Sequence, residues 1–404
     1  MLSLLIRTAL ALTMTLTTVA HAEEPVKKKH DMAVMWQTAL TKPPIAVSAA
    51  FDSSGRLWLA KVENGYVLVS HSDDTGKTFN PAVKVNTAPE RIAAEGENRP
   101  KVAVAGDGTV YISYTEHLDQ PFSGNVRFSR SLDGGKSFSV PIIVNDNRET
   151  ISHRFDTLGV DAKGKIYLAW LDKREASAAQ KSGERYAGAA LYYAESDNRG
   201  DSFSTNKRLA SNTCECCRVA MAMDTDDVPV IFWRHIYDNN VRDHAVLRLG
   251  GKGGMMRVNE DNWQIDACPH HGGAISVGGD GAYHVVWFTN APQRKGLFYA
   301  RSSDQGKTFS TPMPFGDHQA QAGHPHVLAQ GENVFIAWKE FDGQRAAVYG
   351  MASQDQGSSW SKPVRVADTA GASDHPLLIG NGKRAFLSWN TVKEGWRLID
   401  VAAP

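Results

Sequence analysis

The chain has 404 residues, of which 42% are hydrophobic and 22% are charged. This balance is typical of a large folded protein and excludes a disordered chain or one made mainly of membrane spans. Basic and acidic residues number 44 each, so no global charge favours nucleic acid or an anionic membrane surface as a partner.

The first 22 residues have the pattern of an export signal. One basic residue, Arg7, precedes an apolar run over 8–20, and the small-x-small triplet Ala20-His21-Ala22 follows. A membrane anchor is the alternative, but the run is shorter than the roughly 20 residues that a span needs. We expect a signal peptide over 1–22, a solvated leader over 23–30, and a periplasmic or secreted protein with no integral membrane segment, in which disulfides are permitted.

A unit of two short strands joined by a turn recurs seven times from residue 43 onwards, at spacings of roughly 50 to 65 residues. A third strand and usually a short fourth strand follow each unit. Four-stranded antiparallel sheets repeated radially form a β-propeller. We predict an all-β, seven-bladed propeller as a single domain over 31–404. The seventh unit lacks a fourth strand, and Asp31–Thr38 is expected to supply it by pairing with the strand around 395–402.

Five segments between third and fourth strands share the pattern Ser-x-Asp/Asn-x-Gly-x-Ser/Thr-Phe/Trp. They are Ser72–Phe79, Ser131–Phe138, Ser196–Phe203, Ser302–Phe309 and Ser353–Trp360, so blades four and seven lack the pattern. The acid or amide is expected to bond backbone N–H groups in a tight turn, and the aromatic to pack under its own hairpin. The shared polar residues are therefore turn-formers and not catalysts: Asp74, Asp133, Asn198, Asp304 and Asp355.

These segments resemble the Asp box, or BNR repeat, of the sialidase superfamily, and the repeats extend over most of the chain. The familiar sialidase propeller has six blades, which is the alternative blade count. The resemblance implies an exo-alpha-sialidase-type glycoside hydrolase with an arginine triad for the substrate carboxylate and a Tyr nucleophile activated by a Glu. Arg99-Pro100 matches part of the family's Arg-Ile-Pro motif, and Tyr114 with Glu116 is a candidate pair. Catalytic residues stay unassigned.

A basic residue precedes the first strand of every blade. The seven are Lys42, Arg99, Arg154, Arg218, His271, His324 and His375. First strands line the channel of a propeller, so these residues are expected to ring the funnel mouth on the face opposite the boxes. One interpretation is that each pairs with a carboxylate from a loop between second and third strands, such as Asp172 or Glu340. The other is a site for a small anion or glycan. Its candidate ligand-binding residues are Arg99, Arg154, Arg218, His324 and His375.

All four cysteines fall in two loops of this predicted face. Cys214, Cys216 and Cys217 precede blade four, and Cys268 precedes blade five. Two explanations compete. The thiols form disulfides between neighbouring blades, with three pairings open, or they bind a soft metal such as copper or zinc. The concentration of every thiol beside histidines favours the metal. Its candidate ligands are Cys214, Cys216, Cys217, Cys268, His270 and His271.

The sequence therefore predicts an exported Asp-box propeller that binds a ligand at its funnel face, with a soft metal such as copper as the first choice. The alternatives are a sialidase-type hydrolase and a protein-interaction scaffold held together by disulfides.

Overall fold

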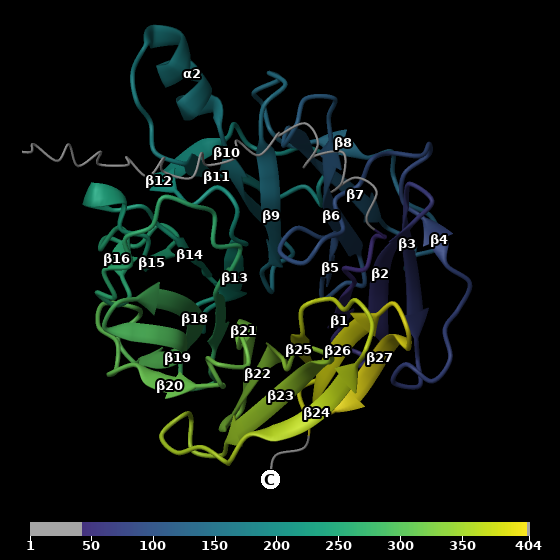
Figure 1. Cartoon of the computed structure of the whole chain (residues 1–404). Helices are drawn as coiled ribbons and strands as arrows, with labels where there is room; N and C mark the ends of the chain where they lie inside the picture. The colour runs from purple at the N-terminus through teal and green to yellow at the C-terminus, as the bar shows by residue number, and fades with distance from the viewer. Residues whose placement is uncertain (1–42, 402–404) are drawn as a thin grey trace, which may run out of the picture.

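The structure is a computed structural model that describes residues 43–401. These residues form seven antiparallel sheets, and consecutive strands are neighbours in each sheet. The sheets stand in a ring with the first strand of each nearest the centre (Figure 1). The first strand of the last sheet contacts the first strand of the first sheet, which closes the ring. In the described part of the chain, no helix is long and apolar enough to cross a membrane.

The first three blades contain β1 (Ser48–Phe51), β2 (Leu57–Glu63), β3 (Tyr66–Ser72) and β4 (Val83–Lys84); β5 (Lys101–Val104), β6 (Val110–His117), β7 (Gly124–Ser131) and β8 (Ile142–Ile143); and β9 (His153–Val160), β10 (Ile166–Asp172), β11 (Ala189–Ser196) and β12 (Lys207–Thr213).

The last four blades contain β13 (Ala220–Met223), β14 (Pro229–Arg234), β15 (His244–Arg248) and β16 (Met256–Arg257); β17 (Ala274–Val277), β18 (Tyr283–Ala291), β19 (Arg294–Ser302) and β20 (Met313–Phe315); β21 (Gly323–Gln330), β22 (Asn333–Phe341), β23 (Ala346–Ser353) and β24 (Val364–Thr369); and β25 (Leu377–Gly380), β26 (Ala385–Thr391) and β27 (Gly395–Asp400).

The predicted seven-bladed propeller is confirmed, and the six-bladed alternative is wrong. Six sheets have four strands and the last has three within the described residues. The segment expected to supply the missing strand, Asp31–Thr38, lies outside the described residues, so this closure stays a prediction.

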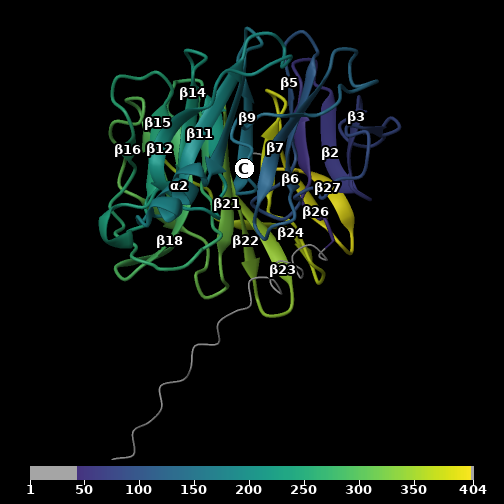
Figure 2. The ribbon, with the colours of Figure 1, turned by 90° about the horizontal axis from the view of Figure 1, so that it is seen from above.

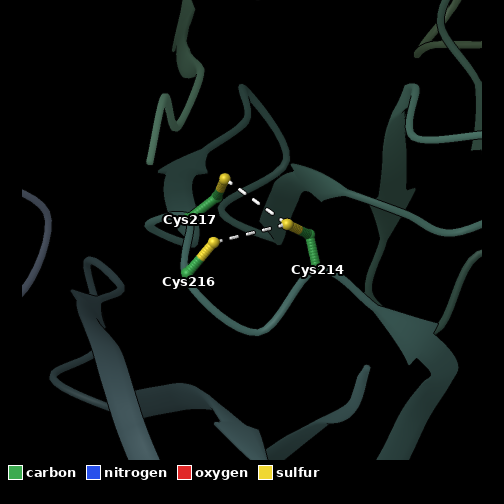
Figure 3. A group of neighbouring side chains, drawn as sticks. All are labelled: Cys214, Cys216 and Cys217. Carbon is green, nitrogen blue, oxygen red and sulfur yellow. Dashed lines mark hydrogen bonds between the residues drawn. The ribbon is translucent and has the colours of Figure 1, made fainter. Parts of the chain in front are cut away.

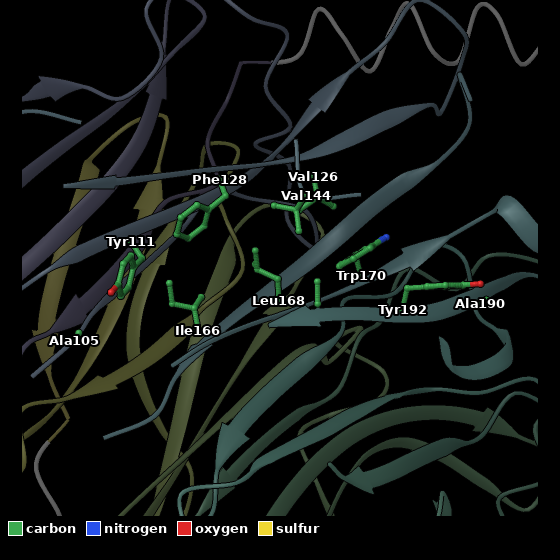
Figure 4. Packing of buried hydrophobic residues seen from close by; sticks show 11 residues of the cluster. Ala105, Tyr111, Val126, Phe128, Val144, Ile166, Leu168, Trp170, Ala190 and Tyr192 are labelled. Atoms are coloured by element: carbon green, nitrogen blue, oxygen red, sulfur yellow. The ribbon is translucent and has the colours of Figure 1, made fainter. Parts of the chain in front are cut away.

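The hydrophobic core lies between neighbouring blades. Second strands are buried on both faces, as in β10, because each face meets an adjacent sheet. Five of them carry a tryptophan with 1% exposure or less: Trp170, Trp233, Trp287, Trp338 and Trp389. Figure 4 shows one interface, where Tyr111 and Phe128 of blade two pack near Ile166 and Leu168 of blade three. Burial of each such large apolar side chain stabilises the fold by about 1.5–3 kcal/mol.

The Asp boxes form the turns that the sequence predicts. In the first box, Asp74 accepts hydrogen bonds from the backbone N–H groups of Lys77 and Thr78 at 3.0 and 2.9 Å. Its other oxygen accepts from the Thr78 hydroxyl at 2.6 Å. The Ser72 hydroxyl oxygen accepts from Gly76 N–H at 2.8 Å. The role of Asp74 as a turn-former is therefore confirmed.

The aromatic residue of the box packs differently from our expectation. Phe203 of blade three meets Phe128 of blade two at 4.9 Å between ring centroids, and Trp360 of blade six meets Tyr299 of blade five at 4.8 Å. Phe79 of blade one meets Trp396 of blade seven at 5.5 Å, across the ring closure. The aromatic residues of these three boxes thus contact the preceding blade and do not only close their own hairpins.

One α-helix, α2 (Arg174–Ser182), interrupts the loop between β10 and β11. It begins where Asp172 accepts a hydrogen bond from Arg174 N–H at 2.9 Å, and it ends at Gly183, whose φ of 77° is in the left-handed region. It packs against β11 and stands out from the ring in Figure 1, so that it faces the viewer in Figure 2.

Candidate functional site

The loops that join one blade to the next bring the predicted site residues together. Each such loop leads from the last strand of a blade to the first strand of the following blade, at the inside of the ring. Arg154 and His324 lie in the first strands β9 and β21, near their N-terminal ends, and the other described members of the basic column lie in the preceding loops. Lys42 lies outside the described residues.

Arg99 is held by a buried ion pair. Its two terminal nitrogens donate to Asp374 Oδ2 and Oδ1 at 2.7 and 2.8 Å, and one also donates to the Val47 carbonyl at 2.9 Å. Asp374 Oδ2 in turn accepts from Val47 N–H at 3.0 Å. Arg99 and Asp374 are 5% and 2% exposed. These contacts tie blades one, two and seven together, and they favour a structural role for Arg99 over ligand binding.

The other two arginines are also engaged within the protein. Arg154 lies 3.4 Å from Glu95 Oε1. Arg218 donates to the carbonyl oxygens of Gly273 and Pro325 at 3.0 and 2.8 Å. The carboxylates that contact these basic residues come from the loops between blades. The carboxylates of the loops between second and third strands pair with other residues. Asp172, for example, accepts from His153 and Arg174.

Glu97 contacts residues at or just before the first strands of four other blades. Its Oε2 accepts hydrogen bonds from the backbone N–H groups of Arg218 at 3.1 Å and Gly272 at 2.9 Å. Its Oε1 faces His324 Nδ1 at 3.1 Å and His375 Nδ1 at 3.3 Å. Burial alone would raise the pKa of Glu97, but Arg218 and the two imidazoles more than offset it and hold the pKa well below its usual range.

Three histidines of successive blades stack on one another. The rings of His324 and His375 have centroids 3.5 Å apart, and those of His271 and His324 are 4.6 Å apart. Phe288 ends the stack at 4.2 Å from His271. Burial lowers the pKa of His271 to about 3 and lowers the pKa values of His324 and His375 as well, so all three rings are neutral near pH 7. We call Glu97, His271, His324 and His375 the histidine cluster.

Three thiols of the loop between β12 and β13 converge in the interior. Cys214 Sγ lies 3.7 Å from Cys216 Sγ and 3.6 Å from Cys217 Sγ (Figure 3). All three residues are buried, and Arg242 donates to Cys214 Sγ at 3.4 Å. Every cysteine of the chain is a free thiol in the structure.

The second cysteine loop meets the first one. Potential ligand atoms of Cys216, Cys268 and His270 all lie within 4.8 Å of one another, with Cys268 and His270 exposed. Cys216 thus belongs to two groups, one buried and one at the surface. We call Cys214, Cys216, Cys217, Cys268 and His270 the cysteine cluster. His271 is the one predicted metal ligand that falls in the other cluster.

The thiols share their protons unevenly. Hydrogen bonds from Cys216 and Cys217 hold the pKa of Cys214 well below its usual value, and Arg234 and Arg242 add to this effect. The bond to Cys214 raises the pKa of Cys216, and burial raises that of Cys217. Without a metal, one thiolate at Cys214 is therefore stabilised by its two neighbours as donors.

Two carboxylates of this face, Glu97 and Asp374, were not predicted from the sequence. Glu97 lies two residues before Arg99 and Asp374 directly before His375, so acids beside the basic column were a visible signal. The partner of Tyr114 also differs from the candidate pair. Its hydroxyl donates to Glu90 Oε2 at 2.6 Å, and Glu116 lies 3.6 Å from Arg127.

Comparisons with known proteins give the fold. No family model and no curated protein matches the chain. Among solved structures, an ulvan lyase of polysaccharide lyase family PL25 aligns with a TM-score of 0.55 at 10% identity, over 90% of this chain and 93% of that one. The BP39L lectin from Burkholderia pseudomallei gives 0.52 at 12% identity, over 89% and 99%. An intramolecular trans-sialidase from Ruminococcus gnavus gives 0.50 at 11%, over 76% and 95%. These likenesses support the β-propeller fold and carry no activity to this chain.

Proposed function

We propose that the protein binds a soft metal ion in the cysteine cluster, with copper(I) preferred over zinc(II). The observation that carries the proposal is the convergence of all four thiols of the chain, as free cysteines, at two adjoining loops with His270. Thiolate and imidazole ligands suit both ions, and a set dominated by sulfur favours copper(I). We also propose that this happens in the periplasm or outside the cell, on the basis of the N-terminal sequence pattern.

The spacing of the sulfurs supports this proposal. A metal bound at about 2.3 Å from each sulfur separates the sulfurs by about 3.8–4.0 Å in tetrahedral or trigonal geometry. Cys214 Sγ lies at 3.7 and 3.6 Å from its two neighbours. Small side-chain rotations would therefore complete a three-sulfur site, and no loop would have to move.

Copper(I) binding by single variants tests the proposal. Reduced protein, kept free of oxygen, is titrated with copper(I) against a chromogenic copper(I) chelator. Cys216→Ser should weaken binding at least tenfold, since Cys216 belongs to both ligand groups. Cys268→Ser should have a smaller effect because it leaves the buried three-sulfur group intact. The affinity for copper(I) should also decrease as the pH is lowered, because the thiols must lose their protons to bind the metal.

Equal binding by wild type and Cys216→Ser would overturn the proposal. A thiol count on protein isolated without reductant separates it from the disulfide alternative. If the cysteines bind metal, four thiols should be titratable after denaturation in the presence of a chelator. If they form two disulfides, none should be. A protein with no bound metal and no titratable thiols would support the scaffold held together by disulfides.

A further inference from the structure

We propose a second metal site in this protein, formed by Glu97, His324 and His375, for a divalent transition-metal ion. It is separate from the cysteine cluster in its residues and in its chemistry. It does not depend on the proposed function, because no thiol takes part. Its ligands are one carboxylate and two imidazoles, which suit zinc(II), cobalt(II) and copper(II).

The ligand separations fit one coordination sphere. Bonds of about 2.0–2.1 Å in a tetrahedral site place neighbouring ligand atoms about 3.3 Å apart. Glu97 Oε1 lies 3.1 Å from His324 Nδ1 and 3.3 Å from His375 Nδ1. One potential ligand atom of each of the three residues lies within 4.8 Å of the other two. The three side chains are already gathered at the required spacing, and the His324 and His375 side chains are 21% and 14% exposed.

The nitrogen atoms of this cluster are incompletely satisfied. His375 Nδ1 is buried, and its only neighbour that could accept a hydrogen bond among the described residues, Glu97 Oε1, lies 3.3 Å away in poor alignment. The Nδ1 atom of His271, which stacks on His324, is buried and has no hydrogen-bond partner in the described part of the chain. Buried polar atoms with weak or missing hydrogen bonds destabilise a fold, and a metal bond to His375 would replace its poorly aligned contact.

The stacking of the two histidine rings means that one ring must rotate before both can bind the same metal ion. The rings of His324 and His375 lie at 17° to each other, so one ion cannot lie in both ring planes as they stand. Rotation of one ring about its Cβ–Cγ bond would turn its Nδ1 toward the ion, and this torsion is soft in histidine. His375 has only the poorly aligned 3.3 Å contact with Glu97 Oε1 to adjust in the rotation.

Backbone groups orient the carboxylate. Glu97 Oε2 is fixed by the N–H groups of Arg218 and Gly272, which leaves Oε1 to face the imidazoles. A Cβ at position 272 would lie 2.3 Å from Glu97 Oε2, so only glycine allows this approach. Outer contacts of this kind hold metal ligands in place. The nearby positive charge of Arg218 favours an anion or hydroxide as the fourth ligand.

Metal binding by a cysteine-free protein tests this site. The variant Cys214→Ser, Cys216→Ser, Cys217→Ser, Cys268→Ser is titrated with cobalt(II) and copper(II). We expect one equivalent of each, a cobalt spectrum without thiolate charge-transfer bands, and nitrogen hyperfine splitting from two imidazoles in the copper spectrum. Glu97→Gln should weaken binding at least tenfold, and His375→Ala should abolish it. His318→Ala is the matched control, because His318 is an exposed histidine outside both clusters.

Two results would overturn the second site: no binding by the folded cysteine-free protein, or equal binding by it and its His375→Ala derivative. If the cysteine-free variant does not fold, wild type is titrated with cobalt(II), and His324→Ala and His375→Ala should lose one equivalent while any thiolate charge-transfer bands stay unchanged. Failure of copper(I) binding in the cysteine variants concerns the proposed function alone, so the two tests fail separately.

Discussion

Two buried carboxylates, Glu97 and Asp374, lie at the centre of the ring and are neutralised in different ways. Asp374 has a full counter-charge in the two-pronged contact with Arg99. Glu97 relies on two backbone N–H groups, two imidazoles and the charge of Arg218. Asp374 is therefore closed to ligands, whereas Glu97 keeps one oxygen facing side chains that can rearrange.

Removal of the Arg99 side chain should lower the stability of the propeller and should have less effect on ligand binding. Arg99→Ala leaves Asp374 buried without its counter-ion, which costs about 3–5 kcal/mol of unfolding free energy. Urea denaturation measures this loss. The double variant Arg99→Met, Asp374→Leu should recover part of it, since an apolar pair carries no uncompensated charge. A loss below about 1 kcal/mol in Arg99→Ala would contradict the structural role.

The wild type should not hydrolyse a fluorogenic sialoside at a measurable rate. The arginine triad that the resemblance implies would need free guanidinium groups, whereas Arg99 binds Asp374 and Arg218 binds backbone carbonyls. Robust hydrolysis that disappears in Arg218→Lys would favour the hydrolase alternative over the metal-binding proposal.

Asp172 should make stability depend on acid pH. Burial alone would raise the pKa of Asp172, but hydrogen bonds from His153 and Arg174 more than offset it and lower the pKa from 3.8 to about 2. A lowered folded-state pKa stabilises the protein above the unfolded value of 3.8, and this is lost as pH falls toward 2. The advantage of wild type over Asp172→Asn should shrink by roughly 2 kcal/mol between pH 6 and 2. Denaturation curves of the two proteins at several pH values between 6 and 2 measure this change. A stability difference that stays constant over this range would contradict the prediction.

At the scale of elements, the Asp box is a local turn with a non-local contact. Hydrogen bonds within eight residues form the turn, so its position follows from the sequence pattern alone. The aromatic and the glycine instead face the preceding blade, and nothing in the repeat indicates which neighbour they meet. The same limit applies to the site: the basic column and the thiol loops were predicted, but the pairing of Arg99 with Asp374, 275 residues apart, was not.

Two adjacent glycines of the second box allow the backbone strain of the turn to be measured separately from the contact with the preceding blade. Gly135 has a φ of 82°, and a Cβ there would lie 2.6 Å from the ring of Trp58 in blade one. Gly134 has a φ of 70° with nothing within 4 Å of such a Cβ. Gly134→Ala should cost about 1–2 kcal/mol through backbone strain alone. Gly135→Ala should cost a further 1–3 kcal/mol, roughly, through the clash. Equal thermal melting of the two variants would argue against the contact between blades.

The whole molecule is stabilised by a closed ring of interfaces. Blade count was predictable because each repeat carries its own strands and turns, and the resemblance to six-bladed sialidases was misleading on this point. The last interface is special, since it joins the two ends of the folded chain. The Arg99–Asp374 pair and the contact of Phe79 with Trp396 both cross between blades at this closure.

The last blade gives the final prediction. Its outer strand β27 has no partner on one edge among the described residues, and an open edge is an unstable end for a sheet. Deletion of Asp31–Thr38 should lower the melting temperature by about 5 °C or more and speed hydrogen exchange in β27. Deletion of residues 23–30 is the control and should change neither. Because β16 and β20 are also outer strands but belong to complete blades, their exchange should be the same in both deletions. Unchanged exchange in β27 would mean that another part of the chain, or no part, covers this edge.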